Sequence, residues 1–574
     1  MEVPIASAVL VVLLFSRIRG LDRAAPSRFD RSLPFFLLVS LCVLAVRLPR
    51  IGWSGELNVD ESQMIAQAMR YLAHPVPWRD VDGTTGGPLD SLLLCPVLLL
   101  GAGATWPTAR IVLWACNCLT LVFLYRALRP FGTRKRCQLA LMPAIFFYAF
   151  AVNANFAHYS SETLSCLLIA VCLALLSTER QASRPSLVRP VLLGLAAGAI
   201  PFAKLQAGPV ALFLVAVGSI IIVRRADAAR ASRPRWIGLA ALFAGVLLIP
   251  GAILGTVIAS GAVRDFWHSY VLASVAYAGQ EGVARKLRNL AYLFTAPADF
   301  RPFAIGVALL LAVSWLTLRA RRTRLEEWMR RPLLVVAAQS VLTLICIAIA
   351  GKSFLHYALL LVPPLALLAG LGWLAATAPG RDQGGADVAP VTSRPLLAAL
   401  AVAMALQIVM PARYLRAVAT GVLPRGHAPV SAVAQSILSV REPGDQLSVW
   451  GWVPAYYVET GLVPATRDAV GHYVVSPGPY QDYFRNRYLA DLEGSRPAFF
   501  VDAVATSMFG WGWSEKEAHE GFPALAEFID RDYRLWKSVR YSPAGTPVRL
   551  YLLRARAAKL GLGAALDTTI GRAP

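Results

Sequence analysis

Residues Leu57–Asp90 read LNVDESQMIAQAMRYLAHPVPWRDVDGTTGGPLD. The stretch contains two pairs of acidic residues, Asp60-Glu61 and Asp80-Val-Asp82, followed by a Gly- and Thr-rich turn sequence. It comes directly after an apolar segment, although acidic residues are scarce in the chain, with 34 Asp and Glu against 56 Lys and Arg. Clustered carboxylates where an apolar segment ends mark this stretch as the first candidate for a functional site.

The composition is that of a polytopic membrane protein. Of 574 residues, 56% are hydrophobic and 16% are charged, whereas soluble proteins carry about 25% charged residues. Apolar runs long enough for membrane spans recur, and within hydrocarbon only helices and closed barrels satisfy their own backbone groups. The net charge of +22 lies mostly in short loops between these runs. The positive-inside rule explains such loops, so nucleic-acid binding is not expected.

The eight cysteines predict neither a disulfide framework nor a metal site. They lie in or beside apolar segments. Cys116 and Cys118 also lack the two-residue gap of a zinc knuckle.

About eleven spans account for both the apolar runs and the arginine-rich loops at 126–136, 180–189, 224–235 and 319–331. We predict spans near residues 33–48, 109–125, 138–153, 160–177, 190–203, 207–223, 236–258, 302–318, 333–350, 355–376 and 395–411. The apolar segment 88–103 is short and is expected to lie on the outer side as a juxtamembrane helix. If it crossed, every arginine-rich loop before Arg331 would face outward.

This topology places the loop 50–108 on the periplasmic or extracellular face. The same face receives 153–160, the turn at Lys204–Gln206, 259–301, the turn at 352–354 and everything after Met410. For residues 1–16 a signal-like start, an interfacial helix and a misplaced start all remain open.

The composition divides the chain into three parts. Residues 1–412 are predicted to form the transmembrane part. Strand-like runs at Gln446–Trp450, Ala498–Val501 and Val548–Leu553 alternate with helical ones at Ser431–Val440, Tyr480–Glu493 and Pro523–Asp532. Such alternation predicts a small extracytoplasmic α/β domain over 413–555. The tail 556–574 is expected to be disordered.

Asp60-Glu61 permits two interpretations. One is a helix N-terminus, where Asn58 or Asp60 caps and an acidic first turn suits the helix dipole. The other is a general base at Asp60 that takes a proton from an acceptor hydroxyl or amine during glycosyl transfer. We favour the catalytic interpretation, chiefly because of where the pair lies in the chain.

Three further carboxylates are candidates. Asp80 and Asp82 have the spacing of a divalent-metal pair, but DVDGTTGGP is also good turn material, and the turn is favoured. No metal or other cofactor is therefore expected. Glu162 begins a predicted span beside His158. It is either part of a helix cap or a second acidic residue of a cavity.

Basic residues recur on the predicted outer face, away from the arginine-rich loops. They are Lys204, the pair Arg264 and His268, and the group Lys352, His356 and Tyr357. A lysine at a membrane boundary often only extends its ammonium toward water. Three basic clusters around one outer vestibule would suit a polyprenyl phosphate, whose charge needs cations once it leaves water.

Together these motifs resemble the GT-C glycosyltransferases, in particular the branch of the protein O-mannosyltransferases and the lipid A aminoarabinose transferase. The resemblance covers roughly residues 33–375. Its motifs occur in order as Asp60-Glu61, Asp82 with Gly87-Pro88-Leu89, Glu162, Gly194 and Gly198 with Lys204, and His356-Tyr357 before Pro363-Pro364. The chain departs from the family in having Glu162 where Asp is commoner and Gly-Gly-Pro where Lys-Pro-Pro is commoner.

The resemblance implies a GT-C-like polytopic helical fold and an inverting transferase. Such an enzyme moves a sugar from a polyprenyl-phosphate donor to a glycan, lipid or protein acceptor, with Asp60 as the catalytic residue and no catalytic metal. Its neighbour Glu61 is a second catalytic candidate. It also implies a multi-pass protein of the bacterial inner membrane, surrounded by membrane lipids.

Two other classes of function fit less well. A lipid or glycolipid transporter should show internal repeats and charges near mid-membrane, and the sequence shows neither. A membrane-anchored scaffold or sensor would leave the acidic loop and the basic clusters without a role.

Overall fold

The computed structural model describes residues 12, 32–181, 186–228, 235–296, 299–321, 325–378, 380–381, 387–388, 394–419, 427–504, 517–540, 546–561 and 567–570. Residues 1–16 therefore lie, apart from residue 12, outside the described part. The chain forms two compact units. The helical unit comprises residues 1–52, 110–252 and 278–425, and the mixed unit comprises 53–109, 253–277 and 426–574.

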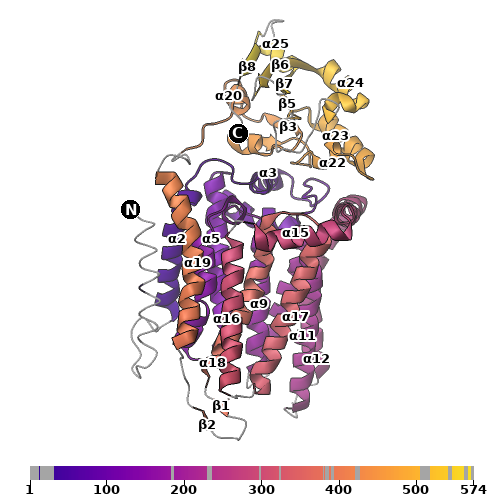
Figure 1. The fold of residues 1–574 in the computed structure, drawn as a ribbon. Helices are drawn as coiled ribbons and strands as arrows, with labels where there is room; N and C mark the ends of the chain where they lie inside the picture. Colours follow the sequence, from indigo (N-terminus) through magenta and orange to yellow (C-terminus); the bar gives the residue numbers. More distant parts are fainter. Residues whose placement is uncertain are drawn as a thin grey trace. The chain divides into compact units, whose positions relative to one another are not determined.

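The long apolar helices of the helical unit run side by side, and α15 (Val283–Thr295) lies across their ends (Figure 1). Its helices are α2 (Ser32–Ile51), α5 (Trp106–Leu128), α6 (Arg134–Ala140), α7 (Met142–Phe150), α8 (Ala154–Ala157), α9 (Glu162–Gln181), α10 (Val188–Ala203), α11 (Gly208–Ala228), α12 (Arg235–Ala259), α15 (Val283–Thr295), α16 (Phe300–Ala320), α17 (Glu327–Ala350), α18 (Val362–Thr377) and α19 (Arg394–Ala419). In the described part of the chain, eight helical segments are long and apolar enough to cross a membrane. The protein is a multi-pass membrane protein.

The predicted spans coincide with these helices. The eight long segments take eight of the predicted positions, α10 and α19 take two more, and α6 with α7 occupies 138–153. All nine residues of α7 are buried, so this helix lies inside the bundle. The fold class predicted from the sequence is confirmed.

The mixed unit contains α3 (Val59–Ala73) and α4 (Pro88–Leu99). At 1.5 Å per residue α4 is about 18 Å long, too short for a hydrocarbon core of about 30 Å. The unit also contains α13 (Val263–Asp265), η4 (Phe266–Leu272), α20 (Ala432–Leu438), α21 (Ala455–Thr460), α22 (His472–Val475), α23 (Gln481–Ser495), α24 (Pro523–Asp532) and α25 (Arg554–Lys559).

A six-stranded sheet forms the centre of the C-terminal part of this unit, with the order β4-β3-β5-β7-β6-β8. Its strands are β3 (Gln446–Trp450), β4 (Val463–Pro464), β5 (Phe499–Asp502), β6 (Tyr533–Arg540), β7 (Val548–Leu553) and β8 (Asp567–Ile570). β3 pairs in parallel with β4 and β5, and β7 pairs antiparallel with β5 and β6. The predicted strands correspond to β3, β5 and β7, and the predicted helices to α20, α23 and α24.

The sequence pattern does not predict β6 or β8. β6 contains a register shift between Leu535 and Lys537, and such a bulge breaks the period-two pattern by which a strand is recognised. β8 lies in the tail for which we predict disorder, yet it pairs in parallel with β6.

Three glycines allow α10 and α12 to pack with their backbones in contact. A Cβ at Gly194 would collide with the carbonyl oxygen of Leu242, and one at Gly198 with that of Val246. Gly245 on α12 faces α10 in the same way. Small residues at this spacing are typical of close helix pairs in membranes. The contact fixes the position of Lys204, because α10 ends immediately before this residue.

Gly198→Ala is expected to force α10 and α12 apart and to lower the free energy of unfolding by about 1–3 kcal/mol, the usual cost of overpacking. Thermal unfolding of the purified protein in detergent measures the effect. The matched control is Gly251→Ala on α12, where an added Cβ meets no atom within 4 Å. Equal stability of the two variants would contradict the close packing of α10 on α12.

Candidate functional site

A buried ion pair lies where α9 begins and α10 ends. Lys204 Nζ is 2.8 Å from Glu162 Oε1 and 2.6 Å from Ser161 Oγ. The ammonium also lies 4.9 Å from the centre of the Tyr357 ring. Lys204 is 6% exposed and Glu162 is fully buried. We call Ser161, Glu162, Lys204, His356 and Tyr357, together with His158, the lysine cluster.

Local backbone structure holds each member of the ion pair. The N–H of Thr163 donates to the carbonyl of Ser160 at 3.0 Å, which turns the chain into α9 with Glu162 as its first residue. Lys204 leaves the helical conformation, with φ −140° and ψ 110°, and separates α10 from a short 3₁₀ turn at Leu205–Ala207. The two side chains therefore come from the ends of neighbouring helices.

Burying such an ion pair has a large cost in free energy. Burying either charge without its partner typically costs about 3–5 kcal/mol. Ionisable residues inside a membrane protein are rare and usually mark a substrate or ion site. The lysine cluster is therefore a strong candidate for function.

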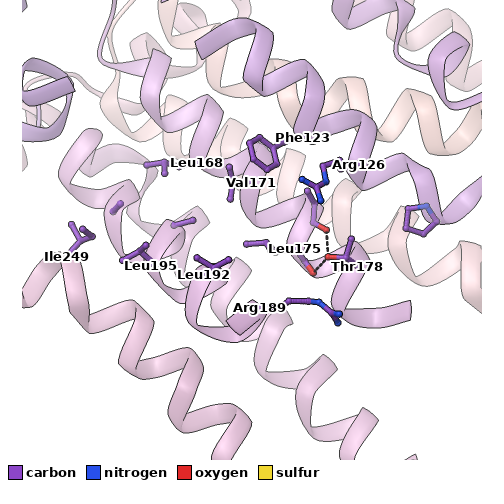
Figure 2. A pocket seen from close by; sticks show the side chains of 14 residues that line it. Phe123, Arg126, Leu168, Val171, Leu175, Thr178, Arg189, Leu192, Leu195 and Ile249 are labelled. Carbon is purple, nitrogen blue, oxygen red and sulfur yellow. Dashed lines mark hydrogen bonds between the residues drawn. The ribbon is translucent and has the colours of Figure 1, made fainter. Parts of the chain in front are cut away.

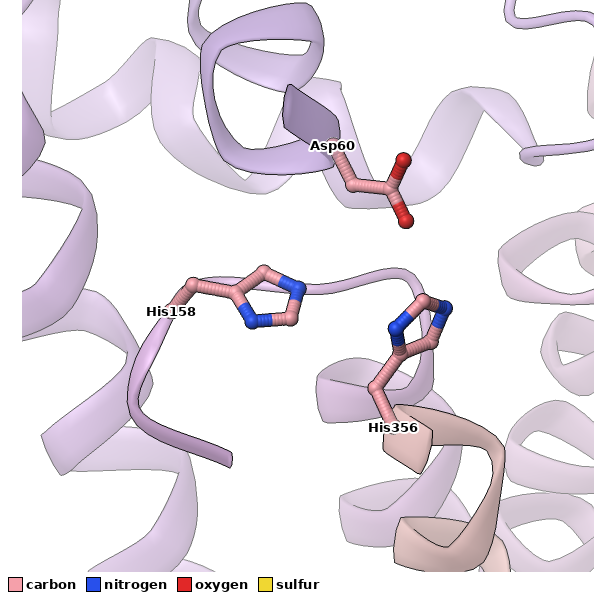
Figure 3. A group of neighbouring side chains, drawn as sticks. All are labelled: Asp60, His158 and His356. Atoms are coloured by element: carbon pink, nitrogen blue, oxygen red, sulfur yellow. The ribbon is translucent and has the colours of Figure 1, made fainter. Parts of the chain in front are cut away.

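Two histidines complete the cluster. The rings of His158 and His356 are 5.5 Å apart in an edge-to-face arrangement (Figure 3). His158 Nδ1 lies 2.8 Å from the carbonyl oxygen of Ala154. A carbonyl only accepts, so Nδ1 carries the proton. Burial, and next the neighbouring His356, lower the pKa of His158 to about 3. His158 is therefore neutral at pH 7, with Nε2 as a hydrogen-bond acceptor.

Among the buried polar atoms of the cluster, His158 Nε2 and Glu162 Oε2 have no hydrogen-bond partner within the described part of the protein. Both are acceptors. Buried polar atoms are normally paired, so these two are suited to hydroxyl groups of a bound molecule. Beside them Lys204 provides a cation. The cluster can thus bind a group that carries both a negative charge and hydroxyls.

Four residues predicted from the sequence meet in this cluster: Glu162, Lys204, His356 and Tyr357. The last two lie on η5 (Leu355–Leu361), a 3₁₀ turn that leads into α18. Lys352 has different neighbours. Its Nζ lies 2.8 Å from Gln280 Oε1 and 3.6 Å from Glu281 Oε1, and burial lowers the pKa of Lys352.

In the mixed unit, Asp60 and Glu61 occupy the first turn of α3. Asn58 caps this helix by accepting a hydrogen bond of 3.1 Å from the N–H of Asp60. The predicted helix start is therefore present, and its cap is Asn58. Glu61 is fully buried, whereas Asp60 is partly exposed. Of the two carboxylates, Asp60 is the more accessible to a substrate.

Glu56 is a further carboxyl group close to this turn. It accepts a hydrogen bond from Ser62 Oγ, which itself accepts one of 2.8 Å from Trp106 Nε1. Burial raises the pKa of Glu56 from 4.5 to about 7, and the neighbouring carboxylates, Glu61 foremost, add to this effect. A further negative charge at the start of α3 is therefore energetically unfavourable.

Asp82 belongs to a buried ion network. Its Oδ1 accepts the N–H of Thr84 at 2.8 Å, which confirms the predicted turn. Its Oδ2 is 2.5 Å from Arg487, which also binds Asp468 at 2.9 Å and Ser269 Oγ at 2.8 Å. The network ties the segments 53–109, 253–277 and 426–574 into one unit. Both carboxylate oxygens of Asp82 are therefore engaged in structural contacts.

Arg264 and His268 pack against α23. The His268 ring stacks on Tyr483 with centroids 4.8 Å apart. The Arg264 guanidinium lies 5.9 Å from the same ring.

Arginines engage both carboxylates of the predicted metal pair and those of one further acidic group. Asp80 binds Arg79, and Asp82 binds Arg487. Asp502, His519 and Glu520 have ligand atoms within 4.8 Å of one another. Arg549 donates to both carboxylates of that group and so supplies the positive charge that a metal would bring.

The sequence pattern does not predict Ser161 or Arg487, and it does not identify His158 as a hydrogen-bond acceptor. Ser161 directly precedes Glu162, so its position next to a candidate carboxylate could have identified it from the sequence. Arg487 lies 405 positions from Asp82, and no local pattern connects the two.

No protein-family model and no curated protein matches the sequence. Among solved structures, the chain is similar to ArnT from Cupriavidus metallidurans bound to undecaprenyl phosphate, with 15% identity and a TM-score of 0.51. It is also similar to apo ArnT from the same organism, with 13% identity and a TM-score of 0.52. Each match covers 91% of this chain and 98% of ArnT.

The chain is also similar to the archaeal oligosaccharyltransferase AglB from Archaeoglobus fulgidus in complex with an inhibitory peptide and a dolichol-phosphate. The identity is 13%, the TM-score is 0.45, and the match covers 91% of this chain and 74% of AglB. The fold assignment rests on the ArnT structures. The chain has the fold of the ArnT structures, in agreement with the GT-C-like fold that the resemblance of its motifs implies.

The raised pKa of Glu56 predicts a pH dependence of stability. Native Glu56 keeps its proton up to about pH 7, while in the unfolded chain it ionises near its ordinary value. Its stabilising contribution is therefore fully present below about pH 4.5 and is lost as the pH rises through about 7. Thermal unfolding between pH 4.5 and 8 should show this loss in the wild type and a flatter profile in Glu56→Gln.

The exposed Glu493→Gln is the matched control and should keep the wild-type profile. An unchanged pH profile in Glu56→Gln would show that this carboxyl group is not the one responsible.

Proposed function

We propose that the chain is a membrane glycosyltransferase that moves a sugar from a polyprenyl-phosphate carrier to an acceptor. The reaction takes place on the membrane face opposite the arginine-rich loops, in the bacterial inner membrane. The observation that carries the proposal is the buried Lys204–Glu162 pair, together with the acceptor atoms Glu162 Oε2 and His158 Nε2, in a chain with the GT-C fold. The ArnT structure bound to undecaprenyl phosphate supports the donor class.

Lys204 binds the phosphate of the donor. As the bond from the sugar to phosphate breaks, negative charge grows on the phosphate oxygen, and an ammonium in a buried site stabilises that charge. Glu162 holds the lysine in position and offsets the cost of burying its charge before the donor arrives. Tyr357 packs its ring against the ammonium.

His158 and Glu162 orient the sugar. The neutral His158 accepts at Nε2, and Glu162 accepts at the oxygen that does not face Lys204. Each can receive a hydrogen bond from a sugar hydroxyl. A charged histidine could not serve as an acceptor, so the lowered pKa of His158 suits this role.

Asp60 is the general base. It takes the proton of the acceptor hydroxyl or amine as the acceptor's lone pair forms a bond to the anomeric carbon. The bond from that carbon to the phosphate oxygen breaks, and its electron pair leaves on the phosphate. A phosphate needs no strong acid to leave, so one carboxylate is sufficient for this inverting displacement.

Asp60→Asn is expected to lower kcat by about 10²–10⁴-fold, the usual contribution of a general base. Binding of the donor should remain unchanged. The measurement is transfer from a synthetic polyprenyl-phosphate sugar by the purified protein, together with equilibrium binding of that donor. Transfer by Asp60→Asn at the wild-type rate would eliminate the proposed base. Lipid transport by a wild type that never transfers sugar would favour a carrier instead.

Lys204→Met is expected to weaken donor binding by about ten- to a hundredfold, because it removes a hydrogen bond to a charged group. The double variant Lys204→Met/Glu162→Gln removes both charges and protects the fold from an unpaired carboxylate. Its donor affinity should be equally low. Arg288→Gln, an exposed cation on α15, is the control. Full donor affinity in the folded double variant would refute the role of Lys204.

A further inference from the structure

A cavity of the helical unit lies at the opposite end of α9 from the lysine cluster. It is a groove of about 560 Å³ between α9, α11, α17 and α18, within the size range of ligand sites. Four arginines line it: Arg180, Arg224, Arg225 and Arg331. We call it the arginine-rimmed groove.

The walls of this groove are apolar. Leu173, Leu176 and Leu371 form buried parts of the lining, whereas Ile220 and Leu334 are 51% and 58% exposed. An apolar surface of this kind on a membrane protein contacts acyl chains. A molecule that fills the groove must therefore have a long apolar part.

The rim has an excess of positive charge. Arg225 pairs with Glu179, and Arg331 pairs with Glu327. Arg180 donates to the backbone carbonyl of Glu327 at 3.4 Å. Four arginines thus face two carboxylates. A bound anion would balance this excess, and a guanidinium is well shaped to bind a phosphate.

The groove is distinct from the lysine cluster. The 19-residue span Glu162–Arg180 is about 28 Å long at 1.5 Å per residue. Its two ends are thus separated by roughly the thickness of a hydrocarbon core. Arg180 lies at the level of lipid headgroups when Glu162 lies at the opposite surface.

Another groove, on the other side of α9, can be compared with the arginine-rimmed groove in its charge. It lies between α5, α9, α10 and α12 and is larger, about 970 Å³. Its polar end holds only Arg126 and Arg189, near Thr178 (Figure 2). Arg189 is 3.5 Å from Glu179. The two grooves share apolar walls and differ in charge, so the second provides an internal control.

We propose that the arginine-rimmed groove binds an anionic glycerophospholipid of the leaflet at the arginine-rich end of the bundle. Its phosphate lies among the four arginines, and one acyl chain follows Leu173, Leu176 and Leu371 toward the bundle interior. Basic pockets between membrane helices bind lipids of this class. The lipid joins α9, α11 and α17 and does not take part in sugar transfer.

The test uses the full chain, purified in a neutral detergent. Native mass spectrometry and thermal unfolding are recorded with added phosphatidylglycerol or with phosphatidylcholine of the same acyl chains. Wild type should retain phosphatidylglycerol preferentially and unfold at a higher temperature in its presence. Glycerol phosphate, which has the charge without the chains, should have no effect.

Arg180→Gln/Arg224→Gln is expected to weaken phosphatidylglycerol binding by about thirtyfold, since each cation near anionic lipid contributes appreciably. Arg126→Gln, from the other groove, should bind like wild type. If the double variant fails to fold, the exposed Arg224→Gln alone should reduce binding severalfold. Wild-type affinity in these variants, or equal binding of phosphatidylcholine by wild type, would overturn the proposal.

Discussion

Hydrocarbon cannot hydrate a charge or a backbone amide, and this constraint explains where every functional candidate of the helical unit lies. The middle of the bundle is apolar, so charged side chains gather at the helix ends. At one end they form the lysine cluster, and at the other the arginine-rich loops. The lysine cluster still contains buried charges. They persist because Lys204 and Glu162 compensate each other within 2.8 Å.

The mixed unit is built from segments that are distant in sequence, so contacts between these segments must hold it together. Arg487 is the residue that joins them. It binds Asp82 from the loop after α3, Asp468 from the C-terminal part and Ser269 from η4. Its guanidinium has five N–H donors in a fixed planar arrangement, which is sufficient to connect three segments from one buried position. The turn at Asp82 is consequently fixed from both sides, by Thr84 locally and by Arg487 at long range.

The sequence predicted much of this arrangement. Hydropathy located the spans, and the positive-inside rule required the segment that became α4 not to cross. The motif order singled out Glu162, Lys204, His356 and Tyr357, which meet in one cluster. Local patterns could not reveal the unprotonated Nε2 of His158, which depends on the hydrogen bond to Ala154. Nor could they reveal the neighbours of Lys352, since its contact with Glu281 depends on how the start of α15 packs.

Helix α9 connects these observations, because it carries a carboxylate at each end. Glu162 pairs with Lys204 at the junction of α10 and α11. Glu179, near the other end, pairs with Arg189 of α10 and Arg225 of α11. Both ends of the α10–α11 hairpin are thus held by the same helix, while the glycines of α10 keep it against α12. In the proposed function, Lys204 binds the donor phosphate at a defined position, and this requires that its backbone does not shift along the membrane normal. The two carboxylates of α9 provide that restriction, and Glu162 therefore acts on Lys204 both as a counter-charge and as one end of a clamp.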